Sequence, residues 1–172
     1  IIKDPREQNN LIAHYPEVAD SLKAALKSWY EEILDDPGSY TFPRFLLGEK
    51  GRDSTYLYAS ASASVSGNVQ GGAHWTSGWL GEGDGQSLLV RVLEAGSYSF
   101  SLDARELRRG TELLLRIGDH ELRARSAGSH ILEMGSADLG PGDFELEIKV
   151  SEAQKSEDPL MNSLRGIICK KI

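Results

Sequence analysis

Hydrophobic residues change their spacing once along this chain, close to residue 36. Before that point, large apolar residues recur every three or four positions, which places them on one face of an amphipathic helix. Pro16 suits the first turn of such a helix, because the missing N–H of proline has no partner there anyway. The segment Asp35-Asp36-Pro37-Gly38 is expected to end the helix, because proline and glycine are typical of helix C-termini. The pattern therefore predicts one helix that begins at Pro16 and ends near Asp35, with residues 35–41 as a linker. Its apolar stripe consists of Val18, Leu22, Leu26, Trp29 and Ile33.

Beyond the linker, apolar and polar residues alternate, which is the period of a strand with one buried face. In Ser97–Ala104, for example, tyrosine, phenylalanine and leucine alternate with serine. Turn residues separate the alternating segments, and no second helical pattern occurs. The pattern predicts a mainly β fold, an antiparallel β-sandwich of the jelly-roll type, preceded by the one amphipathic α-helix. The expected strands are Phe42–Leu47, Thr55–Ala59, Gln86–Leu93, Ser97–Ala104, Leu113–Ile117, Glu121–Arg125, His130–Met134, Phe144–Val150 and Leu164–Cys169.

Short turns suggest how some of these strands are connected. Glu94-Ala95-Gly96 predicts a hairpin between the two strands that it joins, and Gly118-Asp119-His120 predicts a second one. The alternating alanines and serines of Ala59–Ser64 are expected to continue the strand before them.

Composition narrows the possible functions. The 172 residues carry a net charge of -7, which disfavours binding to nucleic acid by neutralising its phosphates. No apolar run approaches the ~18–20 residues of a membrane-spanning helix, and no signal peptide is present. The single cysteine excludes an internal disulfide. Cys169 lies in an apolar strand, so we expect a buried, unreactive thiol.

The N-terminal segment resembles a known enzyme family. Asp4-Pro5-Arg6-Glu7-Gln8-Asn9-Asn10-Leu11, followed by Pro16-Glu17-Val18 and by Trp29-Tyr30, is similar to the C-terminal end of the sulfatase (arylsulfatase) family. The resemblance implies that residues 1–36 are the remnant of a sulfatase-like α/β subdomain, with a strand stump at Ile1-Ile2, a turn and the final helix. The family's formylglycine and calcium ion belong to a motif far upstream, so the resemblance assigns no catalytic residue here. It implies that this fragment is not itself an enzyme, that its parent is a sulfuric ester hydrolase whose catalytic domain is missing, and that the location is periplasmic or secreted.

Residues 37–172 resemble a second group, the β-sandwich modules attached to many carbohydrate-active enzymes. The resemblance rests on Gly96-x-Tyr98-x-Phe100-x-Leu102 and on Gly140-Pro141-Gly142-x-Phe144-x-Leu146-x-Ile148. It implies an accessory module that binds glycan, or that shapes the substrate entrance for sulfate ester hydrolysis by the missing domain. The alternative is a purely structural sandwich that packs on the catalytic domain or on another subunit and binds no ligand.

Candidate ligand-binding residues concentrate in the glycine-rich loop Gly71–Trp79. Trp75 and Trp79 could stack on sugar rings, and His74 lies beside them. Tyr56 is a further candidate for glycan contact. The alternative is that one or both tryptophans cap the core of the sandwich or pack on the sulfatase-like domain.

Two charged clusters are also candidates. Arg105, Arg108 and Arg109 lie on one connection, and guanidinium groups suit the sulfate of a sulfated glycan. Glu82 and Asp84 could offer oxygen ligands to calcium, although their segment lacks the alternating carboxylates of a calcium loop and would also serve as a solvated turn. No other metal or cofactor is expected.

Overall fold

The computed structural model describes residue 4 and residues 8–35, 42–153 and 158–172. The chain divides into two compact units, Ile1–Thr41 and Phe42–Ile172. The predicted strand stump at Ile1-Ile2, the turn at Pro5 and most of the linker at 35–41, with the predicted boundary between residues 36 and 37, lie outside the described residues.

The N-terminal unit contains the predicted helix, α1 (Pro16–Asp35), which begins at the expected proline. Ahead of it, Asp4 Oδ2 accepts a hydrogen bond of 2.8 Å from the backbone N–H of Asn9. The helix buries none of its residues. Within the described residues, no helix combines the length and the apolar character needed to cross a bilayer.

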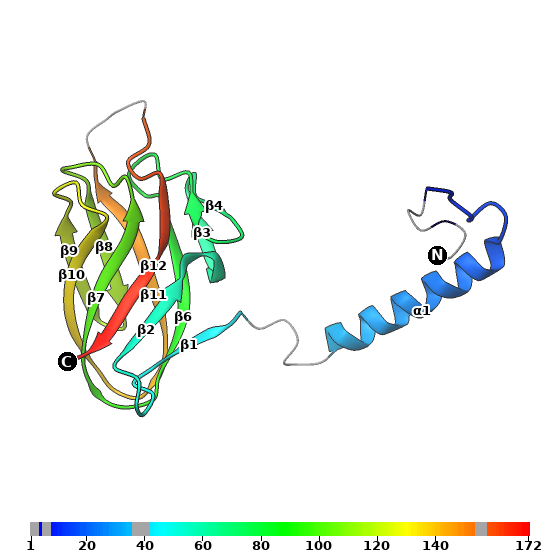
Figure 1. Ribbon diagram of the computed structural model, residues 1–172. Helices are drawn as coiled ribbons and strands as arrows, with labels where there is room; N and C mark the ends of the chain where they lie inside the picture. The colour runs from blue at the N-terminus through cyan, green and yellow to red at the C-terminus, as the bar shows by residue number, and fades with distance from the viewer. Residues whose placement is uncertain (1–3, 5–7, 36–41, 154–157) are drawn as a thin grey trace. The chain divides into compact units, whose positions relative to one another are not determined.

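The C-terminal unit is a sandwich of two six-stranded sheets (Figure 1). Sheet A has the order β1-β6-β11-β8-β9, with β3 paired to β6, and sheet B has the order β10-β7-β12-β5-β4, with β2 paired to β12. Sheet A consists of β1 (Arg44–Leu47), β3 (Ser64–Ser66), β6 (Gly85–Val92), β8 (Glu112–Ile117), β9 (His120–Arg125) and β11 (Gly142–Glu152). Sheet B consists of β2 (Ser54–Tyr58), β4 (Gln70–Gly71), β5 (Thr76–Ser77), β7 (Gly96–Arg105), β10 (Ile131–Leu139) and β12 (Ser163–Lys171). The mainly β sandwich preceded by one helix is therefore confirmed.

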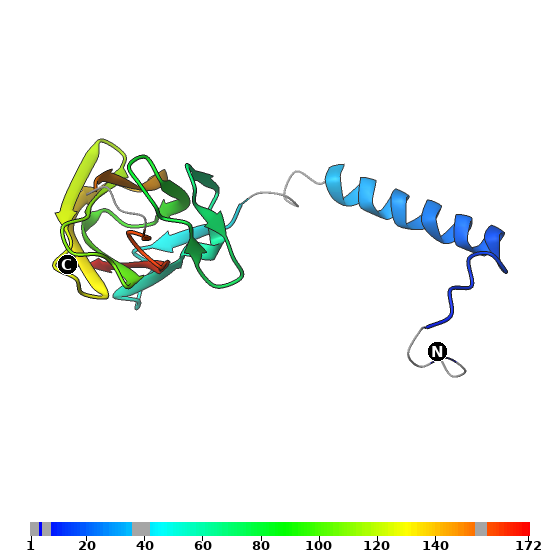
Figure 2. The same ribbon diagram turned by 90° about the horizontal axis from the view of Figure 1, so that it is seen from above.

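The core consists of apolar side chains from both sheets, and Figure 2 shows the two sheets facing each other from above. The alternation predicted for β7 is correct, because Tyr98, Phe100 and Leu102 are buried and the serines between them are not. Cys169 lies in the same core, and burial raises the pKa of its thiol to about 12. The expectation of a buried thiol is thus confirmed.

One of the two predicted hairpins is wrong. The strands β6 and β7 belong to different sheets, so residues 93–95 cross from sheet A to sheet B instead of closing a hairpin. Each strand buries an apolar face between the sheets, and alternation alone does not distinguish a crossing connection from a hairpin. The Tyr98 hydroxyl donates a hydrogen bond of 2.6 Å to the Glu94 carbonyl and holds the crossing. The second hairpin is correct, since β8 and β9 pair with Ile117 opposite His120.

Two further predictions need correction. The segment Ala59–Ala61 forms a 3-10 turn and does not continue β2. Its first alanine is fully buried, so the chain turns into the core there. The strand β1 starts at Arg44, not Phe42, and pairs with β6 in parallel, so the sandwich is not entirely antiparallel.

Candidate functional site

A hollow of about 340 Å³ lies at one end of the sandwich, lined by Trp75, Arg105, Ser163 and Arg165. Strand register brings these residues together from three distant segments. Ser163 at the start of β12 lies opposite Arg105 at the end of β7. The next residue of β12 pairs with Thr76, which directly follows Trp75. In Figure 1, this is the upper end of the sandwich, where β7 ends and β12 begins.

Arg165 lies where the pairing of β12 with β7 is irregular, between Leu164 and Gly166. Such a bulge redirects a side chain that regular alternation would place differently. Leu164 and Gly166 are buried, whereas Arg165 between them is exposed. The Arg165 Nε lies 3.5 Å from Asp103 Oδ1, on the adjacent strand.

Arg105 has a similarly loose ion pair. Its Nε lies 3.8 Å from Oε1 of Glu106. Among the described residues, neither Arg105 nor Arg165 makes a side-chain hydrogen bond to the protein. A guanidinium has five N–H donors, so both retain most of their hydrogen-bonding capacity.

Trp75 supplies the aromatic surface of the hollow, with 49% of its area exposed. It lies on the loop between β4 and β5. The ring of His74 is 6.0 Å from its ring at an angle of 41°, so the two rings do not stack face to face. His74 is exposed and does not line the hollow.

The loop that carries Trp75 is closed at its base by the buried carboxylate of Asp84. Oδ1 accepts hydrogen bonds from the backbone and side-chain N–H groups of Asn68, at 2.7 and 3.1 Å. Oδ2 accepts from the backbone N–H groups of Leu80 and Gly81, at 2.6 and 2.8 Å. Burial raises the pKa of Asp84, but these donors outweigh it and the net pKa is lowered. Asp84 therefore joins the two ends of the segment that presents Trp75.

The same contacts bear on Glu82 and Asp84 as candidate calcium ligands. Four N–H donors occupy the oxygens of Asp84, which leaves them no lone pair directed at a cation. Glu82 is exposed. Within the described part of the chain, no three His, Cys, Asp or Glu side chains gather in a way that could hold a metal ion.

Glycine is required at the same loop base. Gly78 has φ +81°, and a Cβ there would lie 2.2 Å from the Asn68 carbonyl oxygen. A side chain would be strained in this conformation and would also force the two ends of the loop apart.

Trp79 is fully buried, so it cannot present its ring to a sugar, and its prediction as a glycan contact is wrong. Its Nε1 donates to Thr76 Oγ1 at 3.3 Å, and that hydroxyl donates to Gln86 Oε1 at 2.6 Å. Its backbone pairs with Met161. The alternative interpretation, in which a tryptophan packs in the core, therefore applies to Trp79, which contacts Thr76 and Met161 there.

Arg108 and Arg109 do not line the hollow and instead hold loops. Arg108 donates to the Asp158 carbonyl at 3.2 Å, and Arg109 donates to the Ala127 carbonyl at 3.1 Å. Of the three arginines predicted to bind sulfate, the structure brings only Arg105 to Trp75.

Tyr56 lies over Gly166 on the outer face of sheet B. A Cβ on Gly166 would be 2.5 Å from its ring. The Tyr56 hydroxyl donates to Asp103 Oδ2 at 2.8 Å. Burial raises the pKa of Tyr56, and the hydrogen bond to Asp103 raises it further. Tyr56 and Tyr58 line a different hollow, of about 450 Å³, so Tyr56 reaches the Trp75 site only through Asp103.

Sequence reasoning missed Ser163 and Arg165. Arg165 is the one charged residue in the apolar segment Leu164–Cys169. A charge inside an otherwise apolar strand was the available signal, but the bulge that directs it toward Trp75 follows from pairing and not from composition.

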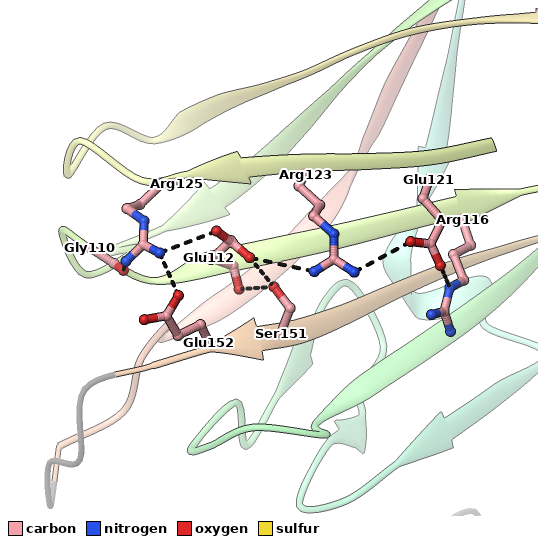
Figure 3. A network of polar contacts seen from close by, with 8 residues as sticks. All are labelled: Gly110, Glu112, Arg116, Glu121, Arg123, Arg125, Ser151 and Glu152. Carbon is pink, nitrogen blue, oxygen red and sulfur yellow. Dashed lines mark hydrogen bonds and ion pairs between the residues drawn. The ribbon is translucent and has the colours of Figure 1, made fainter.

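The outer face of sheet A carries a different polar surface, a row of ion pairs (Figure 3). Arg125 donates to Glu152 at 2.5 Å, and Arg116 donates to Glu121 at 2.6 Å. Arg123 lies between them, 3.5 Å from Glu112 and 3.3 Å from Glu121. Ser151 donates to Glu112, and this hydrogen bond, together with the arginines, lowers the pKa of Glu112. Each of these arginines contacts at least one carboxylate.

Comparison with known proteins identifies a fold but not a family. No family model matches the chain, and no curated protein matches it. Among solved structures, the C-terminal CBM6 of the laminarinase LamC from Zobellia galactanivorans aligns with a TM-score of 0.52 and 11% identity, over 69% of this chain and 99% of that one. The GH26-CBM35 β-(1,4)-mannanase of Podospora anserina aligns with a TM-score of 0.55 and 11% identity, over 70% of this chain and 28% of that one.

The fold also occurs outside carbohydrate-binding modules. The insecticidal crystal protein Cry2Aa aligns with a TM-score of 0.58 and 11% identity, over 74% of this chain and 23% of that one. The alignments therefore show that this protein has the β-sandwich fold of carbohydrate-binding modules. At such identities they show the fold alone, and this chain spans less than a third of the mannanase.

Proposed function

We propose that residues 42–172 form a non-catalytic module that binds glycan at the hollow beside Trp75. The observation that carries the proposal is the half-exposed indole of Trp75 in a hollow that also contains a serine and two arginines. The β-sandwich fold shared with carbohydrate-binding modules supports it.

The chemistry of the hollow suits a sugar. The C–H face of a pyranose ring packs on an indole, while hydroxyl groups take hydrogen bonds from nearby polar side chains. Ser163 and the two guanidiniums are placed to donate such bonds.

The loops around the hollow are joined to one another by backbone hydrogen bonds. Leu160 N–H donates to the Trp79 carbonyl at 2.9 Å, and Asn162 N–H donates to the Arg105 carbonyl at 3.1 Å. Arg108 N–H donates to the Leu160 carbonyl at 2.8 Å. A site held in this way loses little conformational entropy when a ligand binds.

The test is Trp75→Ala, measured by affinity electrophoresis in gels that contain a panel of soluble polysaccharides. We expect retention by at least one polysaccharide to weaken at least about tenfold, as for a central aromatic contact. The melting temperature should stay unchanged, because the indole is half exposed. Trp29→Ala on α1 is the matched control, since it removes an exposed tryptophan from the other unit.

Two results would count against the proposal. Retention that survives Trp75→Ala would exclude this hollow as the site. A folded wild-type protein that no polysaccharide retains would favour the purely structural sandwich.

The N-terminal segment leads to a proposal about the parent protein. On the resemblance of residues 1–36 to the end of a sulfatase, the sandwich would accompany a sulfatase catalytic domain in the periplasm or outside the cell. There it would hold the enzyme to its glycan or shape the substrate entrance. Intact mass spectrometry of the protein from its source tests this, because a sulfatase parent requires a mass far above 18.9 kDa and peptides with the formylglycine motif. A mass of 18.9 kDa would exclude the parent and leave glycan binding untouched.

A further inference from the structure

We infer that the sugar bound at Trp75 carries an acidic group, a carboxylate or a sulfate ester, which Arg105 and Arg165 hold together. The inference rests on the proposed function and specifies its ligand class. Both guanidiniums line the same hollow as the indole, and their side chains are 62% and 46% exposed.

The pairing of these two arginines differs from that of Arg91 and Arg116, which also lie in the sandwich. A charge-assisted hydrogen bond between guanidinium and carboxylate is about 2.7–2.9 Å long. Arg91 and Arg116 have such short contacts, at 2.5 Å to Asp143 and 2.6 Å to Glu121. At the hollow, the nearest carboxylates remain at 3.5 Å from Arg165 and 3.8 Å from Arg105.

The neighbouring carboxylates are held by other groups, which explains these long distances. Oδ2 of Asp103 accepts the hydroxyl of Tyr56 at 2.8 Å. Oε2 of Glu106 accepts the side-chain amide of Asn162 at 3.1 Å. Glu106 also has a φ of 55°, the only positive φ among the described residues that are not glycine, so its backbone is fixed in an unusual conformation.

The consequence is a pair of guanidiniums that have no short contact with a carboxylate and that line the same hollow as the indole of Trp75. A carboxylate or a sulfate accepts two parallel N–H donors from one guanidinium, a geometry that a neutral hydroxyl does not offer. An acidic sugar therefore satisfies both arginines while its ring packs on Trp75.

The test compares polymers that differ only in charge. Dextran sulfate is paired with dextran, and polygalacturonate is paired with its methyl ester, in affinity electrophoresis and titration calorimetry of the full chain. We expect at least one charged polymer to bind at least about tenfold more tightly than its neutral partner. The pair that shows the difference identifies the acidic group as sulfate or carboxylate.

Variants assign the preference to the hollow. Arg105→Gln and Arg165→Gln should each weaken binding of the preferred charged polymer about tenfold, and should weaken any binding of its neutral partner by clearly less, because a hydroxyl forms a weaker hydrogen bond with a guanidinium than an anion does. Arg105→Lys should restore only part of the affinity, because lysine keeps the charge but loses the planar pair of donors. Arg109→Gln is the control, since it makes the same change in net charge on the same connection but outside the hollow.

The outcomes separate the inference from the proposed function. If neutral and charged polymers bind equally and both depend on Trp75, the glycan site stands and the acidic ligand is wrong. If no polymer of either kind is retained, both fail. Arg165→Gln removes the contact to Asp103 and can thereby disturb Tyr56. If the melting temperature of this variant falls, Arg105→Gln decides the case, because Arg105 loses only its 3.8 Å contact to Glu106.

Discussion

Two hollows of similar volume lie on opposite sheets of the sandwich, and they differ in how their arginines are paired. The hollow on sheet A, of about 330 Å³, has only polar residues around it. Its arginine, Arg116, contacts Glu121 at 2.6 Å and Glu147 at 3.4 Å. The hollow beside sheet B, of about 340 Å³, has Trp75 and two arginines whose side chains lie 3.5 Å or more from the carboxylates they pair with. The residues that line the hollow on sheet A are Ser64, Ser66, Gln86, Ser87, Arg116, Glu145 and Glu147.

The difference shows that arginine has two roles in this protein, forming ion pairs on sheet A and offering accessible donors beside Trp75. On sheet A, carboxylates from β8, β9 and β11 complete the coordination of the arginines, so an anionic ligand would have to displace them (Figure 3). At Trp75, the carboxylates are restrained by Tyr56 and Asn162, so the guanidiniums remain accessible. Accessible donors beside an aromatic surface are typical of a binding site. The arginines on sheet A already have carboxylate partners and need no ligand to pair with.

The largest effect is expected at Asp84, whose hydrogen bonds hold the loop that carries Trp75. Asp84→Ala removes the acceptor of four part-buried hydrogen bonds from Asn68, Leu80 and Gly81, so we expect a loss of about 3 kcal/mol or more in the free energy of unfolding. Glycan affinity should fall together with stability. Urea unfolding followed by tryptophan fluorescence measures the loss, and Glu82→Ala, which removes an exposed carboxylate two residues away, is the control. A rise in melting temperature on adding calcium that Asp84→Ala abolishes would show instead that Asp84 is a metal ligand.

The lowered pKa of Asp84 sets the pH at which this contribution disappears. Because the folded pKa lies below the unfolded value of about 3.9, the stabilisation is complete above that value and is lost as the pH falls through the folded pKa. We therefore expect wild-type protein to lose stability below about pH 4 more steeply than Asp84→Asn does. Unfolding curves in urea between pH 2 and 7 test this, and parallel curves for the two proteins would contradict it.

A smaller effect is expected at Gly166, under the ring of Tyr56. A Cβ there would meet the Leu57 carbonyl oxygen and the Tyr56 ring, each at 2.5 Å. Gly166→Ala should cost about 1–3 kcal/mol and release Asp103, which could then close on Arg165. Binding of the acidic polymer should weaken as well. The control is Gly140→Ala, because no atom lies within 4 Å of a Cβ at that position. Unchanged stability of Gly166→Ala would mean that the Tyr56 ring is not fixed above the glycine.

The sequence predicts which side chains are buried better than it predicts which strands are neighbours. Alternation in β7 correctly assigns Tyr98 and Phe100 to the core, because the period of a strand is a local property. Whether residues 93–95 close a hairpin or cross between sheets depends on the partners β11 and β12, which follow much later in the chain. Local patterns carry no information about that choice.

The same limit explains the outcome for the site. Loop composition singles out Trp75 and Trp79 equally, but only Trp79 is buried, where it pairs with Met161 and donates to Thr76. Likewise, the sequence offers no way to rank the three candidate arginines on one connection, because only β12 places Ser163 and Arg165 beside Arg105. Residue types indicated the chemistry, and long-range pairing selected the residues that share a hollow.

The smallest effect is expected on sheet A, and it provides the most direct check of the comparison. Arg123→Gln removes contacts of 3.3 and 3.5 Å to half-exposed or partly exposed carboxylates, so the melting temperature should fall by no more than a few degrees. That difference should vanish in 1 M NaCl, where the screening length is about 3 Å. Retention by glycan should not change, in contrast to Arg105→Gln, which alters the net charge equally. If Arg123→Gln weakens retention as much as Arg105→Gln does, overall charge governs binding, and the accessible arginines beside Trp75 have no special role.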